Sequence, residues 1–322
     1  MIDKTTVAGL PTIVLAGGHK NIRLHDFATL FTDMYRYHEH YLPLGSYKTT
    51  REIHGSIAGQ SGRFPLILYI LHTLTRVAAI GPVKVVGPAP ELKAALDRAP
   101  FPVDRFELIP QGQSFGSNVM LGYQAIGSKG HALLVMGDSP LTTTRCIEDF
   151  IALSRNYLHR DFILPVVKAA ILDELARFMP RPYIRLLPEG LEPAGYCTAS
   201  DLDSRGRIGC RLSSLALANL TGTTAEQIDH LRSLRKALRP AVQKMLRKEL
   251  GTNVLIQYRR GITFSWLAEK FEHLYFKSMQ VVGLPHAGAA LDVDSSADLQ
   301  SISRIMRYRR RRHATAKTDS PG

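Results

Sequence analysis

Glycines that end an apolar run are the first residues of this chain whose type and spacing could do chemistry. The apolar run over 12–16 stops at Gly17 and Gly18, and Lys20 and Arg23 follow closely. Backbone N–H groups at such a turn can hold a phosphate group, and nearby cations favour one. The alternative is a tight turn with incidental basic residues. The predicted phosphate cradle comprises Leu15, Ala16, Gly17 and Gly18, with Lys20 and Arg23 as its cations.

Aspartates supply a second kind of chemistry. Asp138 follows the apolar run 132–136, where it could hold Mg²⁺ or, alternatively, cap the next turn. Asp292 and Asp294 lie two residues apart in a predicted strand over 289–294, so their side chains would face the same way. One of them could complete a metal site with Asp138, and Asp294 could also be the N-cap of the final helix.

A polar loop over 111–118 carries amide and hydroxyl side chains. Gln111, Gly116, Ser117 and Asn118 could contact a base edge or a ribose. The alternative is an ordinary loop between a strand and a helix, with Ser117 as the cap of that helix.

These residues need a scaffold that brings them together. Apolar runs typical of strands alternate with helical segments through the first half of the chain, with strands predicted over 12–16, 83–87, 106–110, 132–136 and 162–167. This alternation predicts a three-layer α/β fold in which helices cover both faces of a mainly parallel sheet. Ligands bind at the carboxyl ends of the strands in such sheets, so the glycine turn, the 111–118 loop and Asp138 should converge.

The second half of the chain is less regular. From 224 to about 279 the pattern is helical and basic, before the chain returns to the sheet at Val281 and Leu291. We predict a single domain over 8–306, with its core in 10–165 and 281–306 and a helical insertion over 224–280. A basic tail over 309–322 is predicted to be disordered.

Composition limits the class of protein. The 322 residues are 45% hydrophobic and 21% charged, which provides for a folded core. The three cysteines lack the spacing of a zinc site or a disulfide framework, and the chain shows neither a signal peptide nor an apolar run long enough to span a membrane. We therefore expect a cytoplasmic protein.

The formal net charge is +13, from 41 Lys and Arg against 28 Asp and Glu. Such a surface attracts phosphorylated substrates, nucleic acid or an anionic membrane, or it is simply a solvated basic surface. Because no nucleic-acid-binding motif accompanies the charge, we predict no specific nucleic-acid partner.

Taken together, these motifs resemble the nucleotidyltransferase superfamily with its Rossmann-like, GT-A type fold, especially the branch of molybdenum-cofactor guanylyltransferases (the MobA-like NTP transferases). The matching segments lie in 10–165 and 281–306. They are Leu15-Ala16-Gly17-Gly18, Pro65-Leu66-Ile67, Gly116-Ser117-Asn118, Gly137-Asp138-Ser139-Pro140 and the run from Leu291 to Leu299, which is similar to the closing motif D-x-D-[TS]-P-E-D-L.

The resemblance implies an enzyme that transfers a nucleoside monophosphate from an NTP to a phosphorylated small-molecule acceptor (a sugar, alcohol or cofactor phosphate) and releases pyrophosphate. It implies Mg²⁺ or Mn²⁺ on Asp138 and on Asp294 or Asp292. Lys20 and Lys48 are its candidate phosphate-holding lysines. Residues 166–223 would form the acceptor side, with Lys168 and Gly195 as candidate acceptor-binding residues.

The chain also departs from the family pattern. Arg23 comes one place later than in L-A-G-G-x-x-x-R-M-G, no Met-Gly follows it, and Ser296 replaces the proline of the closing motif. Two other functions therefore stay open. A GT-A glycosyltransferase would keep the aspartates without a triphosphate cradle, and a homologue that binds a nucleotide without turnover would keep the fold alone. The helical insertion could shape the acceptor pocket, form a dimer contact or touch an anionic membrane.

Overall fold

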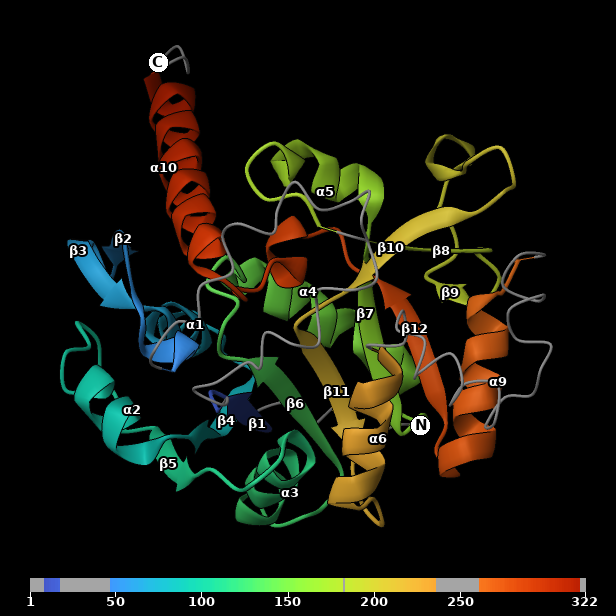
Figure 1. Ribbon diagram of the computed structural model, residues 1–322, viewed down its shortest axis with the longest axis horizontal. Coiled ribbons are helices and arrows are strands. Elements are labelled where there is room, and N and C mark those ends of the chain that lie inside the picture. Colours follow the sequence, from blue (N-terminus) through green and yellow to red (C-terminus); the bar gives the residue numbers. More distant parts are fainter. Residues whose placement is uncertain (1–8, 18–46, 182, 236–260, 319–322) are drawn as a thin grey trace.

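Buried strands that alternate with helices arrange the chain around one large sheet (Figure 1). The computed structural model describes residues 9–17, 47–181, 183–235 and 261–318. In these ranges the main sheet has ten strands. They are β1 (Leu10–Leu15), β4 (Ile80–Gly87), β5 (Phe106–Pro110), β6 (His131–Met136), β7 (Phe162–Lys168), β8 (Ile184–Leu186), β9 (Leu191–Glu192), β10 (Ile208–Leu212), β11 (Leu215–Asn219) and β12 (Met279–Gly283).

The sheet is mixed. Its strand order is β5-β4-β1-β6-β11-β7-β10-β8, and β12 pairs with both β7 and β9. The pairs β4–β5, β1–β4, β1–β6, β7–β12 and β9–β12 are parallel, whereas β10 and β11 run antiparallel to their neighbours. The predicted α/β class is therefore confirmed, with β11 inserted antiparallel between β6 and β7. Strands β1 and β6 end side by side, which brings the segments after Leu15 and Met136 together.

Helices cover both faces of the sheet, as the alternation predicts. Within the described ranges they are α1 (Leu66–Thr75), α2 (Ala89–Leu96), α3 (Phe115–Ala125), α4 (Thr144–Ser154), α5 (Ala169–Ala176), α6 (Ala225–Arg235), α9 (Phe264–Tyr275) and α10 (Ser296–Thr318). Short 3₁₀ turns occur at η3 (Lys48–Thr50), η4 (Arg155–Tyr157), η5 (Ala199–Asp201) and η6 (Ala287–Ala290).

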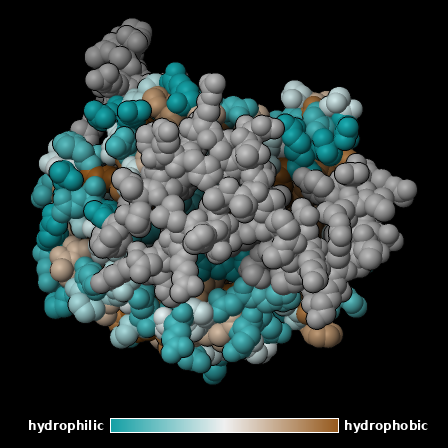
Figure 2. Space-filling view, viewed as in Figure 1, coloured by the Kyte–Doolittle hydropathy of each residue, from teal (hydrophilic) through white to brown (hydrophobic). Residues whose placement is uncertain are grey.

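Strand β1 shows how the two hydrophobic cores are divided. Ile13 and Val14 are both fully buried, but their side chains belong to different cores because successive strand residues point to opposite faces. Val14 packs in the core beneath α1, α2, α4, α5 and α10. Ile13 packs in the core beneath α3, α6 and α9. On the face shown in Figure 2, the described surface is predominantly hydrophilic, as the outer sides of such helices require.

One hairpin was not predicted, and one local prediction is wrong. Residues 52–65 form a hairpin of β2 (Glu52–Ile57) and β3 (Gln60–Pro65). The predicted strand over 289–294 is the end of η6 followed by irregular backbone. Its backbone groups form single hydrogen bonds and not the regular ladder of a strand. Val293 N donates to Asp138 O at 3.0 Å, and Ala289 O accepts from Ser214 N at 2.7 Å.

The C-terminal half also differs from expectation. Helices α6 and α9 lie within the predicted insertion, whose residues 236–260 are outside the described ranges. Helix α6 packs against the start of α3, where Asp229 Oδ1 accepts from Gly116 N at 2.8 Å. The backbone is helical in α10 as far as Thr318, where disorder was predicted from 309. No helix in the described ranges is both long and apolar enough to cross a membrane.

The contact of α3 with the sheet yields a test of packing. A Cβ on Gly122 would collide with the side chain of Ile13 and press on Val86. We expect Gly122→Ala to lower the free energy of unfolding by about 1–3 kcal/mol, because overpacking outweighs the gain in helix propensity of about 1 kcal/mol. The exposed Gln124→Ala on the same helix should be nearly neutral in urea denaturation, and equal stability of the two variants would contradict this packing.

Candidate active site

One ammonium group lies between two carboxylates beyond the carboxyl end of β6. Lys48, in η3, forms ion pairs with Asp138 Oδ2 and, at 3.1 Å, with Asp294 Oδ1. Asp138 follows β6 directly, and Asp294 lies in the irregular segment before α10. The Asp138 side chain is only 12% exposed and that of Lys48 25%, whereas Asp294 is 45% exposed. The centre is therefore open on the side of Asp294.

Burial and charge act against each other at this centre. Burial raises the pKa of Asp138 above its ordinary value, although the charge of Lys48 opposes the shift. Burial would lower the pKa of Lys48, but the charges of Asp138 and Asp294 raise it overall. The lysine is therefore cationic at any ordinary pH, and it stabilises the ionised form of a buried carboxylate.

Asp292 takes part in a second charge cluster. Arg211 Nη2 donates to Asp292 Oδ1 at 2.8 Å, and Arg211 Nε donates to Ala290 O at 2.8 Å. Arg181 forms an ion pair with Asp298 at 3.1 Å and donates to the backbone carbonyl of Asp292. Burial would raise the pKa of Asp292, but the charges of Arg211 and Arg181 hold it below its ordinary value.

The two aspartates of the closing motif thus bind different cations, because 291–294 is not a strand and the expected shared direction is lost. Asp294 is not the helix cap either. Ser295 Oγ accepts from Asp298 N at 3.2 Å, while Asp298 Oδ2 accepts from Ser295 N at 2.9 Å. This reciprocal pair is a capping box that begins α10, and it leaves the Asp294 side chain available for Lys48.

Asp138 and Asp294 could hold a divalent cation. Asp138 Oδ1 is buried and has no hydrogen-bond partner among the described residues, although a buried carboxylate oxygen normally has one. Within the same residues no three His, Cys, Asp or Glu side chains gather as metal ligands. Mg²⁺ needs only one or two carboxylates, because substrate phosphates and water complete its shell. The donor set fits a cation that arrives with a nucleotide.

Gly17 lies against the polar loop over 111–118. A Cβ on Gly17 would lie 2.7 Å from Asn118 Nδ2 and 2.8 Å from Gln111 Oε1, so these three residues meet. Gly112 N donates to Asn118 Oδ1 at 2.7 Å, and Gln111 Nε2 donates to the Tyr47 hydroxyl at 3.2 Å. The lysine belongs to the same region, because the neighbouring Thr49 donates its hydroxyl to Ala16 O at 2.8 Å.

Other predicted nucleotide-binding residues have structural partners. Leu15 and Ala16 are buried, and their backbones pair with neighbouring strands. Gly116 N is bound by Asp229, and Ser117 Oγ bonds to the backbone of Ser114, which is the N-cap of α3 in place of Ser117. Gly18, Lys20 and Arg23 lie outside the described residues.

The predicted acceptor-binding residues Lys168 and Gly195 have other partners or positions than the three aspartates of the candidate site. Lys168 Nζ binds Asp201 Oδ2 at 2.8 Å and Tyr196 O at 3.2 Å, so the lysine ties the loop after β9 to the end of β7. Gly195, in that loop, has a φ of +90°, which favours glycine. Arg181 and Arg211, which hold the Asp292 segment, were missed by the sequence analysis because no spacing links them to the aspartates.

Removing the lysine tests the electrostatics. In Lys48→Met, Asp138 loses the charge that opposes its burial, so its folded pKa rises further above the unfolded value of about 3.9. The folded state then binds the proton more tightly, and stability falls as the pH rises through the folded pKa. With EDTA present, urea denaturation should show a loss of roughly 2 kcal/mol near pH 8 and a smaller loss near pH 5. Lys48→Met/Asp138→Asn should abolish this pH dependence, and a pH-independent loss in the single variant would contradict the assignment.

Comparisons with known proteins identify the fold. No protein-family model matches the chain, and no curated protein matches it. A hypothetical transferase structure from Thermus thermophilus is 16% identical over 90% of this chain and 99% of its own, with a TM-score of 0.59. CMP:2-keto-3-deoxy-manno-octonic acid synthetase, solved with CTP, is 12% identical over 94% of this chain and all of its own, with a TM-score of 0.51. The chain therefore has the α/β fold of these two proteins along nearly its whole length.

Proposed function

We propose that the protein transfers a nucleoside monophosphate from an NTP to a phosphorylated small-molecule acceptor. The observation that carries the proposal is the lysine–carboxylate centre of Lys48, Asp138 and Asp294, at the carboxyl ends of β1 and β6 and in the region of Gly17. The likeness of the fold to a synthetase solved with CTP is consistent with an NTP substrate.

The reaction is an in-line substitution at phosphorus. An oxygen of the acceptor phosphate attacks the α-phosphorus, the bond from that phosphorus to the bridging oxygen of the β-phosphate breaks, and pyrophosphate leaves with the electron pair. No side-chain nucleophile is needed, so the protein contributes positioning and charge. Mg²⁺ or Mn²⁺ held by Asp138 and Asp294 would neutralise negative charge on the phosphates.

Lys48 has a second role in this proposal. Without nucleotide, its ammonium balances the two carboxylates. A divalent cation on those carboxylates would make that balance unnecessary, and the flexible lysine could then turn towards the phosphates. The predicted roles of Lys20 and Arg23 in holding the triphosphate belong to the same proposal.

The base would lie against the amide groups of Gln111 and Asn118, which meet at Gly17. The amides of Gln111 and Asn118 converge there, and each is oriented by a hydrogen bond to Tyr47 or Gly112. One amide can accept and the other can donate, which suits the edge of a base. A Cβ at Gly17 would collide with both amide groups, so the glycine allows the two side chains to lie this close to the turn.

The first test is release of pyrophosphate. The purified protein is incubated with each of the four NTPs, Mg²⁺ and a panel of sugar, alcohol and cofactor phosphates. We expect one NTP to support release that depends on an acceptor and on the metal. Sugar transfer from a nucleotide sugar without pyrophosphate release would instead identify a glycosyltransferase, and NTP binding without any turnover would identify a non-catalytic homologue.

Variants of the aspartates test the assignment of roles. Asp138→Asn and Asp294→Asn should each lower kcat by about 100-fold or more, because they remove charge at the reacting phosphates. Asp292→Asn should cost less, since Asp292 binds Arg211 and not Lys48. The exposed Asp104→Asn is the matched control and should keep full activity. Full activity of Asp138→Asn would exclude this centre.

A further inference from the structure

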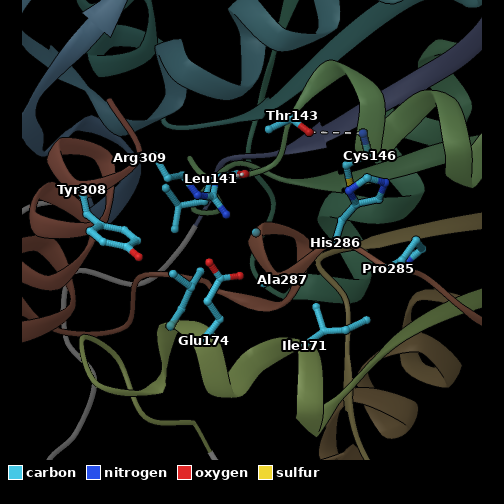
Figure 3. Close-up of a pocket in the computed structure, with 12 residues that line it drawn as sticks. Leu141, Thr143, Cys146, Ile171, Glu174, Pro285, His286, Ala287, Tyr308 and Arg309 are labelled. Atoms are coloured by element: carbon cyan, nitrogen blue, oxygen red, sulfur yellow. Dashed lines mark hydrogen bonds between the residues drawn. The ribbon is translucent and has the colours of Figure 1, made fainter. Parts of the chain in front are cut away.

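A cavity of about 550 Å³ lies in the helical layer on one face of the sheet (Figure 3). The segment after Asp138, helices α4, α5 and α10 and the segment before Asp292 form its walls. Among the residues that line it are Leu141, Cys146, Glu174, His286, Tyr308 and Arg309, and neither Lys48 nor any of the three aspartates of the candidate site is included. Its volume lies within the range of about 300–1,000 Å³ that is typical of small-molecule sites.

Arg309 brings a positive charge into this cavity from α10. Among the described residues its only hydrogen bond is to Leu141 O, at 3.5 Å, and it forms no ion pair with any of them. Burial lowers the pKa of Arg309, and the charge of Glu174 opposes this without cancelling it. A guanidinium has five N–H donors and stays charged in proteins, so Arg309 is suited to bind an anion.

Glu174 lies on the opposite wall. In Figure 3 its carboxylate, from α5, and the guanidinium of Arg309 point into the same space. A carboxylate has about four acceptor positions, so it can accept hydrogen bonds from ligand hydroxyl groups beside its protein contacts. Leu141 and Ile171 add apolar surface to the wall of the cavity.

The remaining polar groups of the wall are satisfied or neutral. His286 Nε2 bonds to Asp149 Oδ2 at 2.8 Å. Burial raises the pKa of the Cys146 thiol to about 12, so it is neutral and offers Arg309 no anion. The cavity therefore combines a cation that forms no ion pair with the described residues and a carboxylate that can accept from hydroxyl groups.

We propose that this cavity is a second small-molecule site. It takes a compact anion that carries hydroxyl groups, such as a hydroxy acid or a phosphorylated polyol. The carboxylate or phosphate of the ligand pairs with Arg309, and its hydroxyl groups donate to Glu174. A charge-assisted pair of this kind replaces the long hydrogen bond between Arg309 and Leu141 O with shorter and stronger ones.

The walls of the cavity belong to segments that also carry the candidate active site. Leu141 follows Asp138 by three residues. A Cβ on Gly288 would collide with Leu141 O, so the two segments touch through their backbones there. The second segment continues to Val293, whose N–H donates to Asp138 O at 3.0 Å. The site is thus adjacent to the reaction centre without sharing its charged residues, and its ligand does not depend on the proposed function.

Calorimetric titration of the full chain tests the proposal. The probes are glycerate and glycerol 3-phosphate, which distinguish a carboxylate from a phosphate ligand, with glycerol as the neutral control. We expect at least one anionic probe to bind and glycerol not to bind. Arg309→Gln should raise Kd by at least about tenfold, because it removes a charge-assisted pair, and Glu174→Gln should raise it less. Arg307→Gln, an exposed arginine of the same helix, should leave Kd unchanged.

Three results would overturn the proposal. They are the absence of binding by both anionic probes, an unchanged Kd in Arg309→Gln, and a loss of binding in Lys48→Met, which would place the probe in the active site. Arg309→Lys, which keeps the charge, should bind more tightly than Arg309→Gln. This comparison separates a loss of the ligand contact from a loss of the fold, and urea denaturation of each variant confirms that it is folded.

Discussion

The ammonium group of Lys48 joins two carboxylates that the chain delivers from distant positions. Asp138 is buried at the end of a central strand, where an ionised carboxylate without a partner would be unfavourable. Asp294 lies at the open side, 156 residues further along the chain. The lysine between them stabilises the charge of the first and fixes the position of the second. This contact therefore joins η3 and the segment after β6 to the segment before α10.

Cations and carboxylates alternate around the irregular segment before α10. Lys48 binds Asp294, Arg211 binds Asp292 and Arg181 binds Asp298, while the backbone of Val293 bonds to Asp138. This segment has no strand ladder, and it is held instead by Arg211 from β10, Lys48 from η3 and Arg181 from the segment after α5. Such a segment can present two carboxylates in different directions, which a regular strand with the same spacing could not do.

The sequence predicts the parts of the site that depend on local patterns. Gly17 and Asp138 each follow a short apolar run, and such runs become buried parallel strands whose carboxyl ends meet. The direction of Asp292 and Asp294 could not be predicted, because Ala-Leu-Asp-Val-Asp alternates as a strand would, while hydrogen bonds to Ser214 and Asp138 give it another backbone path. Arg181 and Arg211 were missed for a related reason. Ion pairs between distant segments leave no spacing in the sequence, so only the folded structure identifies them.

The position of a bound metal ion tests the central claim most directly. Crystals grown with Mn²⁺ and each of the four non-hydrolysable NTP analogues can be measured at the manganese absorption edge. We expect one anomalous peak in contact with both Asp138 and Asp294, with Lys48 moved from between them towards the phosphates. A nucleotide bound with its Mn²⁺ elsewhere, while Lys48 still joins the two carboxylates, would contradict the assignment of this centre.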